Sequence, residues 1–211
     1  KTSIKSLIAL TITTLALTTA TVNVKAAEAN QVTVLSQVKK VNKISVAGNV
    51  ELILVQSADE SVKVYDSYFS KNALVQQKDG ELRISSFDKE TLTVIAYVSN
   101  LSAITASDNA TVKTFGKFNT LSLDVTLTDQ AKAVLNTNTV SMYAQLNGKS
   151  NLSLTGSTSD YNAVMGSVAS VNMSQFAANS TNIQSKSNTV ASAKNTKTIT
   201  SLEDLYISEN S

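Results

Sequence analysis

Five short segments recur along the second half of the chain at a nearly constant spacing. They begin at Asp108, Asp129, Gly148, Ser167 and Lys186, so successive starts lie 21, 19, 19 and 19 residues apart. Self-similarity at a fixed period of about twenty residues is typical of solenoids, in which each unit buries its apolar face only against its neighbours. This repeat constrains the possible folds more than any other feature of the sequence.

Apolar residues fall into columns when the repeat units are aligned with one another. Within a unit the columns lie two residues apart, which is the alternation of a β-strand and not the spacing of a helix. The columns are Leu123, Met142 and Tyr161; Ile104, Val125, Ala144 and Ala163; Ala106, Leu127, Leu146 and Met165; and Val112, Ala133, Leu152, Val171 and Val190. Each unit is therefore predicted to be one coil of a parallel β-helix, with coils stacked about 4.8 Å apart.

Strand-like runs also precede the repeat, so the chain is expected to be all-β. Before the repeat, Asp79-Gly80 separates two alternating runs, and this dipeptide predicts a β-hairpin. After Val171 the columns are expected to turn polar, with Ser180, Asn182, Gln184 and Asn188 in positions that were apolar before. A final coil of this kind would block end-to-end association, with Leu202, Leu205, Tyr206 and Ile207 closing the end.

The first residues are typical of a secretory signal peptide. Lys1 and Lys5 supply the positive start, Leu7 to Leu17 the apolar stretch, and Val24-Lys25-Ala26 a small-residue cleavage site. The apolar stretch is too short for a transmembrane anchor, so no membrane insertion is expected in the mature form. We therefore predict a signal peptide at 1–26, a polar lead-in at 27–40 and a single domain at 41–211. The repeats span about 101–193 and are followed by a C-terminal cap.

The composition excludes several kinds of chemistry. The chain of 211 residues has no Cys and no His, which removes disulfides, thiol nucleophiles, Cys/His zinc sites and His-based triads. Without Lys1, Lys5 and Lys25, 15 basic residues stand against 16 acidic ones, a formal charge of −1. A nearly neutral chain without a basic run gives no support for nucleic-acid binding. We expect no cofactor.

One outward face of the predicted coils carries candidate ligand-binding residues. Asp124, Tyr143, Gln145 and Asn162 would lie on neighbouring strands and form a flat sugar- or peptide-binding face, with Tyr143 as the stacking ring. The alternative is an ordinary solvated sheet surface, because isolated exposed aromatic residues need no functional explanation.

Asp108 and Asp129 occupy the same place in successive coils. Stacked about 5 Å apart, they are candidates for a carboxylate pair in glycoside chemistry or for a calcium site. The alternative is that each acid hydrogen-bonds its own turn. The next residues in that column are Gly148, Ser167 and Lys186, so no acidic cluster builds up. We therefore assign neither a catalytic residue nor a metal ligand from the sequence.

The segment from Val41 to about Ala193 resembles an exported bacterial family, the putative auto-transporter adhesins or head GIN domains. The resemblance rests on Val41–Leu54, Ser61–Val64, Gly80–Ile84 and the small-residue repeats. The family's Ser-Gly-Ala-Ser-like turns are matched loosely, as in Asn147-Gly148-Lys149-Ser150. The resemblance implies a right-handed β-helical fold outside the cytoplasm, and it carries over no catalytic residues.

Three functions remain open from the sequence. The first is a non-enzymatic extracytoplasmic module that binds a glycan, a peptide or a cell-surface protein and resides in the periplasm, on the cell surface or outside the cell. The second is a polysaccharide lyase or hydrolase that uses Asp108 and Asp129, although such enzymes usually cluster Arg or Lys with Asp and Arg83 is the chain's only arginine. The third is a structural envelope protein. The oligomeric state is left open.

Overall fold

The computed structural model describes residues 32–35, 38–65 and 73–186. All regular structure in these ranges is β-strand, and the fourteen strands belong to one sheet. The strands are β1 (Val32–Leu35), β2 (Lys43–Gly48), β3 (Val50–Gln56), β4 (Ser61–Tyr65), β5 (Ala73–Lys78), β6 (Glu81–Ser86), β7 (Leu92–Val98), β8 (Ala103–Ala106), β9 (Thr111–Phe115), β10 (Phe118–Asn119), β11 (Ser122–Leu127), β12 (Lys132–Leu146), β13 (Asn151–Gly166) and β14 (Ser170–Lys186).

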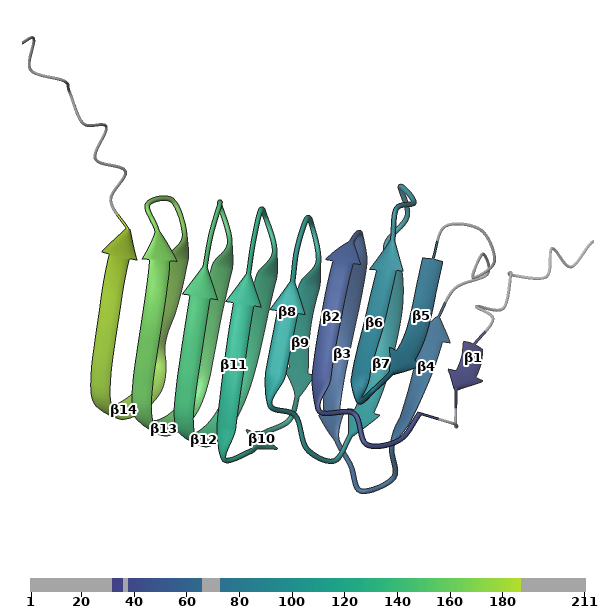
Figure 1. The fold of residues 1–211 in the computed structure, drawn as a ribbon, viewed down its shortest axis with the longest axis horizontal. Coiled ribbons are helices and arrows are strands. Elements are labelled where there is room, and N and C mark those ends of the chain that lie inside the picture. The colour runs from purple at the N-terminus through teal and green to yellow at the C-terminus, as the bar shows by residue number, and fades with distance from the viewer. Residues whose placement is uncertain (1–31, 36–37, 66–72, 187–211) are drawn as a thin grey trace, which may run out of the picture.

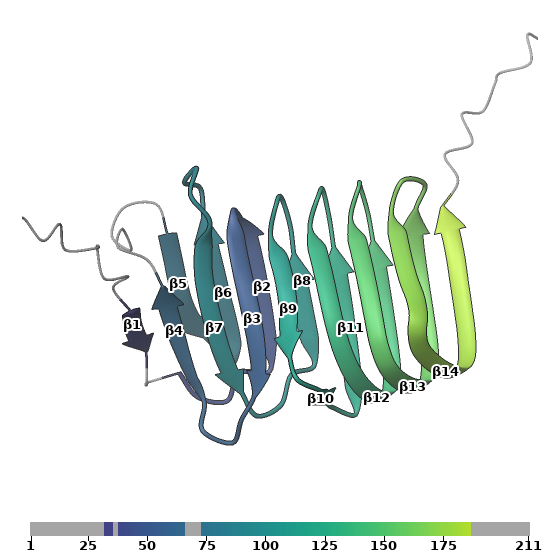
Figure 2. The same cartoon turned by 180° about the vertical axis from the view of Figure 1, so that it is seen from behind.

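The sheet is folded over into two layers that enclose the core. Figure 1 shows β5, β6, β2, β8 and β11 in front, and Figure 2 shows β4, β7, β3 and β9 from behind. The layer with β5, β6, β2, β8 and β11 is called the front layer, and the layer with β4, β7, β3 and β9 the back layer. The long strands β12, β13 and β14 bend from one layer into the other, and this bend is called the corner. Alternate residues of the strands point inward, as in β7, where Leu92, Val94, Ala96 and Val98 are buried and the residues between them are partly exposed.

The predicted columns are confirmed by the strand register. Val125 pairs with Ala144, and Ala144 pairs with Ala163, in parallel strands. Leu127 pairs with Leu146, and both are fully buried. In the back layer Val112, Ala133, Leu152 and Val171 are also neighbours in register. Inside the stack an inward side chain is covered by the strands on either side, and burial of this kind contributes about 1.5–3 kcal/mol per large side chain.

The spatial order of the strands departs from their order in the sequence. We call two strands in opposite layers that are joined by a short turn an arch. The arch β2–β3 lies between the arches β6–β7 and β8–β9, because β2 pairs with β6 and β8 while β3 pairs with β7 and β9. The column Ile104, Val125, Ala144, Ala163 is thereby extended by Ile44 and Leu82.

The N-terminal end of the stack contains antiparallel strands. β5 and β6 form the predicted hairpin, with Lys78 opposite Glu81 and positive φ angles of 51° and 78° at Asp79 and Gly80. β4 pairs antiparallel with β7 and with β1, which lies in the stretch expected to be a polar lead-in. The expectation of an all-β chain is confirmed, whereas the sheet as a whole is mixed and not uniformly parallel.

The expectation for the last coil is wrong by one residue. The register between β13 and β14 shifts at Ser153 and Thr155, so that Tyr161 pairs with Thr181 and Ala163 with Ile183. Ser180, Asn182 and Gln184 therefore continue the outward positions of Asp160, Asn162 and Val164 and do not occupy the apolar columns. A constant period of 19 cannot reveal one inserted residue, which moves every later side chain to the other face. The signal peptide, Asn188, Val190 and the closing residues Leu202 to Ile207 lie outside the described residues.

A glycine and a tyrosine mark tight places in the interior near the corner. Gly156 has a φ of 102°, and a Cβ at this position would overlap the carbonyl oxygen of Thr137 on the neighbouring strand. Tyr161 is 1% exposed and meets the ring of Phe176 edge-on at 6.0 Å, and its hydroxyl finds no hydrogen-bond partner among the residues that the structure describes. Burial raises the pKa of the Tyr161 phenol to about 12. Within the described part of the chain, this hydroxyl therefore fills volume in the core without making a hydrogen bond.

Candidate functional site

The four ligand-binding residues proposed from the sequence lie together on the outer face of the front layer. Asp124 pairs with Tyr143, and Tyr143 pairs with Asn162, across three parallel strands. Gln145 lies two residues beyond Tyr143 on the same side of β12. The alternation of each strand turns all four side chains outward, and Tyr143 is 38% exposed.

A shallow hollow of about 340 Å³ lies on this face over β12, β13 and β14. It is lined by Ser141, Tyr143, Asn162, Ala163, Val164, Asn182 and Gln184. Tyr143 and Asn162 take part in it, whereas Asp124 and Gln145 lie beside it. Asn182 and Gln184 reach the hollow because of the register shift, and a constant period therefore missed them. Amides that both donate and accept hydrogen bonds beside an exposed phenol ring suit an uncharged polar ligand.

Asp108 and Asp129 occupy equivalent turns and bind backbone amides. The Asp108 carboxylate accepts a hydrogen bond from the N–H of Gly48 at 3.0 Å, and the Asp129 carboxylate accepts one from the N–H of Asp108 at 3.3 Å. Each carboxylate also accepts from the preceding hydroxyl, Ser107 or Thr128. Both residues have positive φ angles, 57° and 58°, which Asp tolerates better than most residues. One oxygen of each acid is therefore used to join neighbouring turns.

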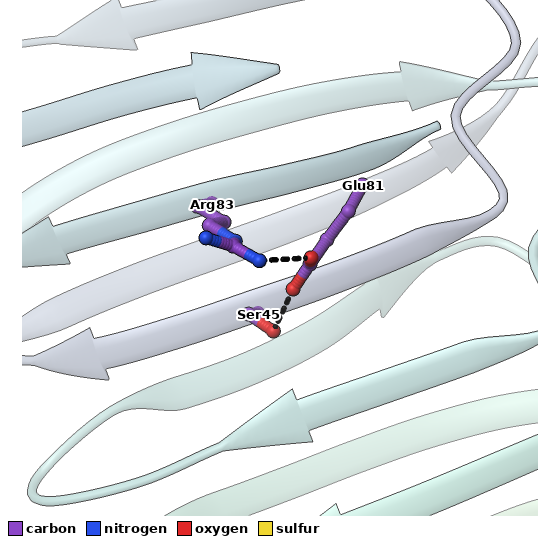
Figure 3. A network of polar contacts seen from close by, with 3 residues as sticks. All are labelled: Ser45, Glu81 and Arg83. Atoms are coloured by element: carbon purple, nitrogen blue, oxygen red, sulfur yellow. Dashed lines mark hydrogen bonds and ion pairs between the residues drawn. The ribbon is translucent and has the colours of Figure 1, made fainter. Parts of the chain in front are cut away.

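The described residues offer no cluster of acids that could hold a metal ion. No group of three or more Asp or Glu side chains with suitable spacing occurs in residues 32–35, 38–65 and 73–186. The arginine sits on another strand, β6, and is engaged elsewhere. Figure 3 shows Arg83 and Ser45 converging on Glu81, with hydrogen bonds of 2.7 and 2.8 Å.

This polar contact shifts the ionisation of its members. Hydrogen bonds from Arg83 and then from Ser45 hold the pKa of the Glu81 carboxyl below its usual value of 4.5. The same pairing with Glu81 raises the pKa of Arg83 above its usual value. Both groups are at the surface, where such a pair contributes little to stability.

A second hollow, of about 570 Å³, was not anticipated. It lies beside β10, which pairs with β12, and it is lined by Ser99, Asn100, Asn119, Thr120, Leu121, Asn138, Thr139 and Val140. Leu121 is 79% and Val140 53% exposed, and the N–H of Val140 donates to the carbonyl of Leu121 at 3.0 Å. The sequence carried a signal for it, because Asn100, Asn119 and Asn138 are spaced by the repeat period of 19.

Comparison with known proteins places the chain in a family. A family model described as "Putative auto-transporter adhesin, head GIN domain" matches residues 40–201. The chain belongs to this family. The match confirms the resemblance stated from the sequence for this head GIN domain.

Solved structures share the fold of this head GIN domain. One, a putative adhesin from Parabacteroides distasonis, is 17% identical with a TM-score of 0.57, covering 74% of this chain and 77% of that one. Another, a putative lipid binding protein from the same species, is 9% identical with a TM-score of 0.56, covering 74% and 78%. No curated protein matches. The part of the chain that the structure describes contains no helix long and apolar enough to cross a membrane.

Proposed function

We propose that this head GIN domain is a non-enzymatic extracytoplasmic binding module that presents the outer face of its front layer to a glycan, a peptide or another cell-envelope partner. The observation that carries the proposal is the hollow over β12, β13 and β14, where Tyr143 lies beside Asn162, Asn182 and Gln184. These side chains come from three strands hydrogen-bonded in register, so their spacing is held by the backbone.

A glycan is the ligand class that this lining favours. Sugars present hydroxyl groups to amides and apolar ring faces to aromatic side chains, and both kinds of group occur here. None of the described residues that line the hollow is charged, which disfavours a strongly ionic ligand. The second structural relative is named a putative lipid binding protein; in the hollow of this chain, an apolar lipid tail would leave the amides of Asn162, Asn182 and Gln184 without partners.

The non-enzymatic assignment is supported by the hydrogen bonds that Asp108 and Asp129 make. The carboxylates of Asp108 and Asp129, which a lyase or hydrolase would require, accept hydrogen bonds from backbone amides of neighbouring turns. The adhesin names of the family and of its structural relative accord with a binding role.

The remaining expectations belong to the same proposal. Residues 1–26 are proposed to direct export and 41–211 to form one domain after the lead-in at 27–40. The parallel stack is proposed to be a right-handed β-helix. The module is then displayed in the periplasm, on the cell surface or outside the cell.

Glycan-array binding of the chain that begins at Ala27 tests the proposal. Binding to at least one glycan class is expected, with at least a tenfold loss of affinity in Tyr143→Ala and in Asn162→Ala. Thr105→Ala is the matched control, because Thr105 is exposed on the same face of the front layer but lies outside the hollow. Binding that survives both substitutions, or that Thr105→Ala abolishes equally, overturns the assignment of the site. Turnover of an envelope polysaccharide that is lost in Asp108→Ala overturns the non-enzymatic assignment.

A further inference from the structure

The last strand of the stack presents a long and nearly uncharged edge. Among the described residues β14 pairs only with β13, so one side of its backbone has no strand partner there. Of its 17 residues, only Lys186 is charged. Natural sheet edges are usually short or carry charged residues or prolines, because an open row of backbone N–H and C=O groups otherwise pairs with another chain.

The opposite end of the stack is protected in these ways. There the sheet ends in β1 and β5, which have 4 and 6 residues. Figure 1 shows the stack tapering toward these two strands, whereas β14 is as long as its neighbour β13. Among the strands that the structure describes, a long and nearly uncharged edge is therefore particular to β14.

The core also ends on half-exposed apolar side chains at β14. Ile183 continues the column of Ala163 and is 46% exposed. On the back-layer half of the strand, Val171 and Met173 are only partly buried against the core. One further layer of strand would cover these side chains as fully as the strands inside the stack are covered.

We propose that β14 pairs antiparallel with β14 of a second copy of this chain, across a two-fold axis near the corner at Ala178. Such an axis exchanges the two layers, so that Ile183 of each copy lies over the half of the strand that carries Val171 and Met173 in the other. The contact is isologous and closes at two copies. Lys186 lies at the end of the strand, so the two lysines stay apart.

The size of this edge sets the strength of the contact. At about 3.3 Å per residue the strand is about 56 Å long, and because one sheet layer with its side chains is about 10 Å thick, the edge offers about 560 Å² per copy. The total of about 1,100 Å² is just under the range of about 1,200–2,000 Å² of standard specific interfaces. A reversible dimer with a dissociation constant on the order of micromolar is therefore expected.

Sedimentation velocity of the chain that begins at Ala27, measured from about 1 to 500 μM, tests the proposal. A concentration-dependent dimer is expected, and Ile183→Lys is expected to weaken it at least tenfold. Val134→Lys is the matched control, because Val134 is 48% exposed on β12, away from the edge. A circular dichroism melt checks that both variants are folded. A monomer at every concentration overturns the proposal, as does a dimer that Ile183→Lys leaves intact or that both variants weaken equally.

Hydrogen exchange shows whether the edge of β14 is covered by a second copy or by residues of the same chain. Amides of β14 that become protected as the concentration rises support pairing between copies. Protection that is equally strong at all concentrations overturns it, because the edge is then covered from within one chain.

Discussion

The Asp108 carboxylate accepts a hydrogen bond from the backbone N–H of Gly48 at 3.0 Å, although the two residues are 60 positions apart. The contact joins the turn between β8 and β9 to the turn between β2 and β3. Gly48, Asp108, Asp129 and Gly148 all have positive φ angles, and they occupy equivalent turns. The turns are thus tied to one another by side chains as well as by strand pairing.

Two substitutions at Asp108 are expected to distinguish the contribution of its hydrogen bond to stability from the contribution of its negative charge. Asp108→Asn keeps an acceptor oxygen and tolerance of positive φ, and should cost less than about 1 kcal/mol of unfolding free energy. Asp108→Ala loses both and leaves the Gly48 N–H without a partner, and should cost about 2–3 kcal/mol. Urea denaturation measures both. Equal losses in the two variants would mean that the negative charge itself stabilises the turn.

Gly156→Ala is expected to be far more damaging than Gly116→Ala. Both glycines have positive φ angles, 102° and 77°, but a Cβ at Gly116 meets nothing within 4 Å. Gly116→Ala should therefore cost only the left-handed backbone strain of about 1–2 kcal/mol. Gly156→Ala should cost more than about 3 kcal/mol or prevent folding, because the Cβ overlaps the Thr137 carbonyl. Denaturation midpoints that fall equally would contradict the steric argument.

Tyr161→Phe is expected to leave stability unchanged or to raise it by up to about 1 kcal/mol. The substitution removes a buried hydroxyl that has no partner in the described ranges and keeps the ring that contacts Phe176. Thermal unfolding at pH 7 measures the effect. A loss of more than about 1 kcal/mol would show that the hydroxyl has a partner, such as a buried water.

The same residue gives a pH dependence with a defined sign. The pKa of Tyr161 in the folded protein, about 12, exceeds the usual value of 10.0. The phenol therefore ionises at a lower pH in the unfolded state than in the folded state. The contribution of the un-ionised phenol to stability is complete below pH 10 and is lost as the pH rises toward 12. The difference in stability between Tyr161→Phe and the parent chain should therefore widen above pH 10. A constant difference would mean that the phenol ionises normally.

Glu81 is expected to titrate below its usual pKa of 4.5. Because the folded pKa is lowered, the stabilising contribution is present above pH 4.5 and is lost as the pH falls through the folded value. NMR titration of the side-chain carboxyl measures the pKa directly. Arg83→Ala should return it toward 4.5, whereas Lys132→Ala, which removes an exposed cation on β12, should not. A carboxyl that titrates normally in the parent chain would mean that the Arg83 contact is absent in solution.

The repeat could be predicted from the sequence because its contacts are nearly local. Residues 19 or 21 apart are neighbours in parallel strands, so one period places Val125 beside Ala144 and Ile104 beside Val125. The Asp79-Gly80 turn was equally accessible, since the two residues with positive φ are adjacent in the sequence.

Two features could not be found by spacing alone. The position of β2 beside β8 is a pairing of residues 60 apart, and no local pattern distinguishes it from pairing with another arch. The inserted residue in β14 leaves the composition of the strand unchanged while it reverses the faces of Asn182 and Ile183. The candidate site was therefore only partly predicted: Tyr143 and Asn162 were named, whereas Asn182 and Gln184 were assigned to the interior.

The interposed arch β2–β3 also has a consequence for the order in which the protein can be assembled. It is made before both of its neighbours, yet its hydrogen-bonding edges are satisfied only by residues 81–98 on one side and 103–115 on the other. Until those residues have been synthesised, Leu52 and Ile44 have no neighbouring strands to pack against. Closing the loops then costs entropy that no strand contacts offset. Completion of the fold must therefore wait for the middle of the chain, and from there the later coils can add in sequence.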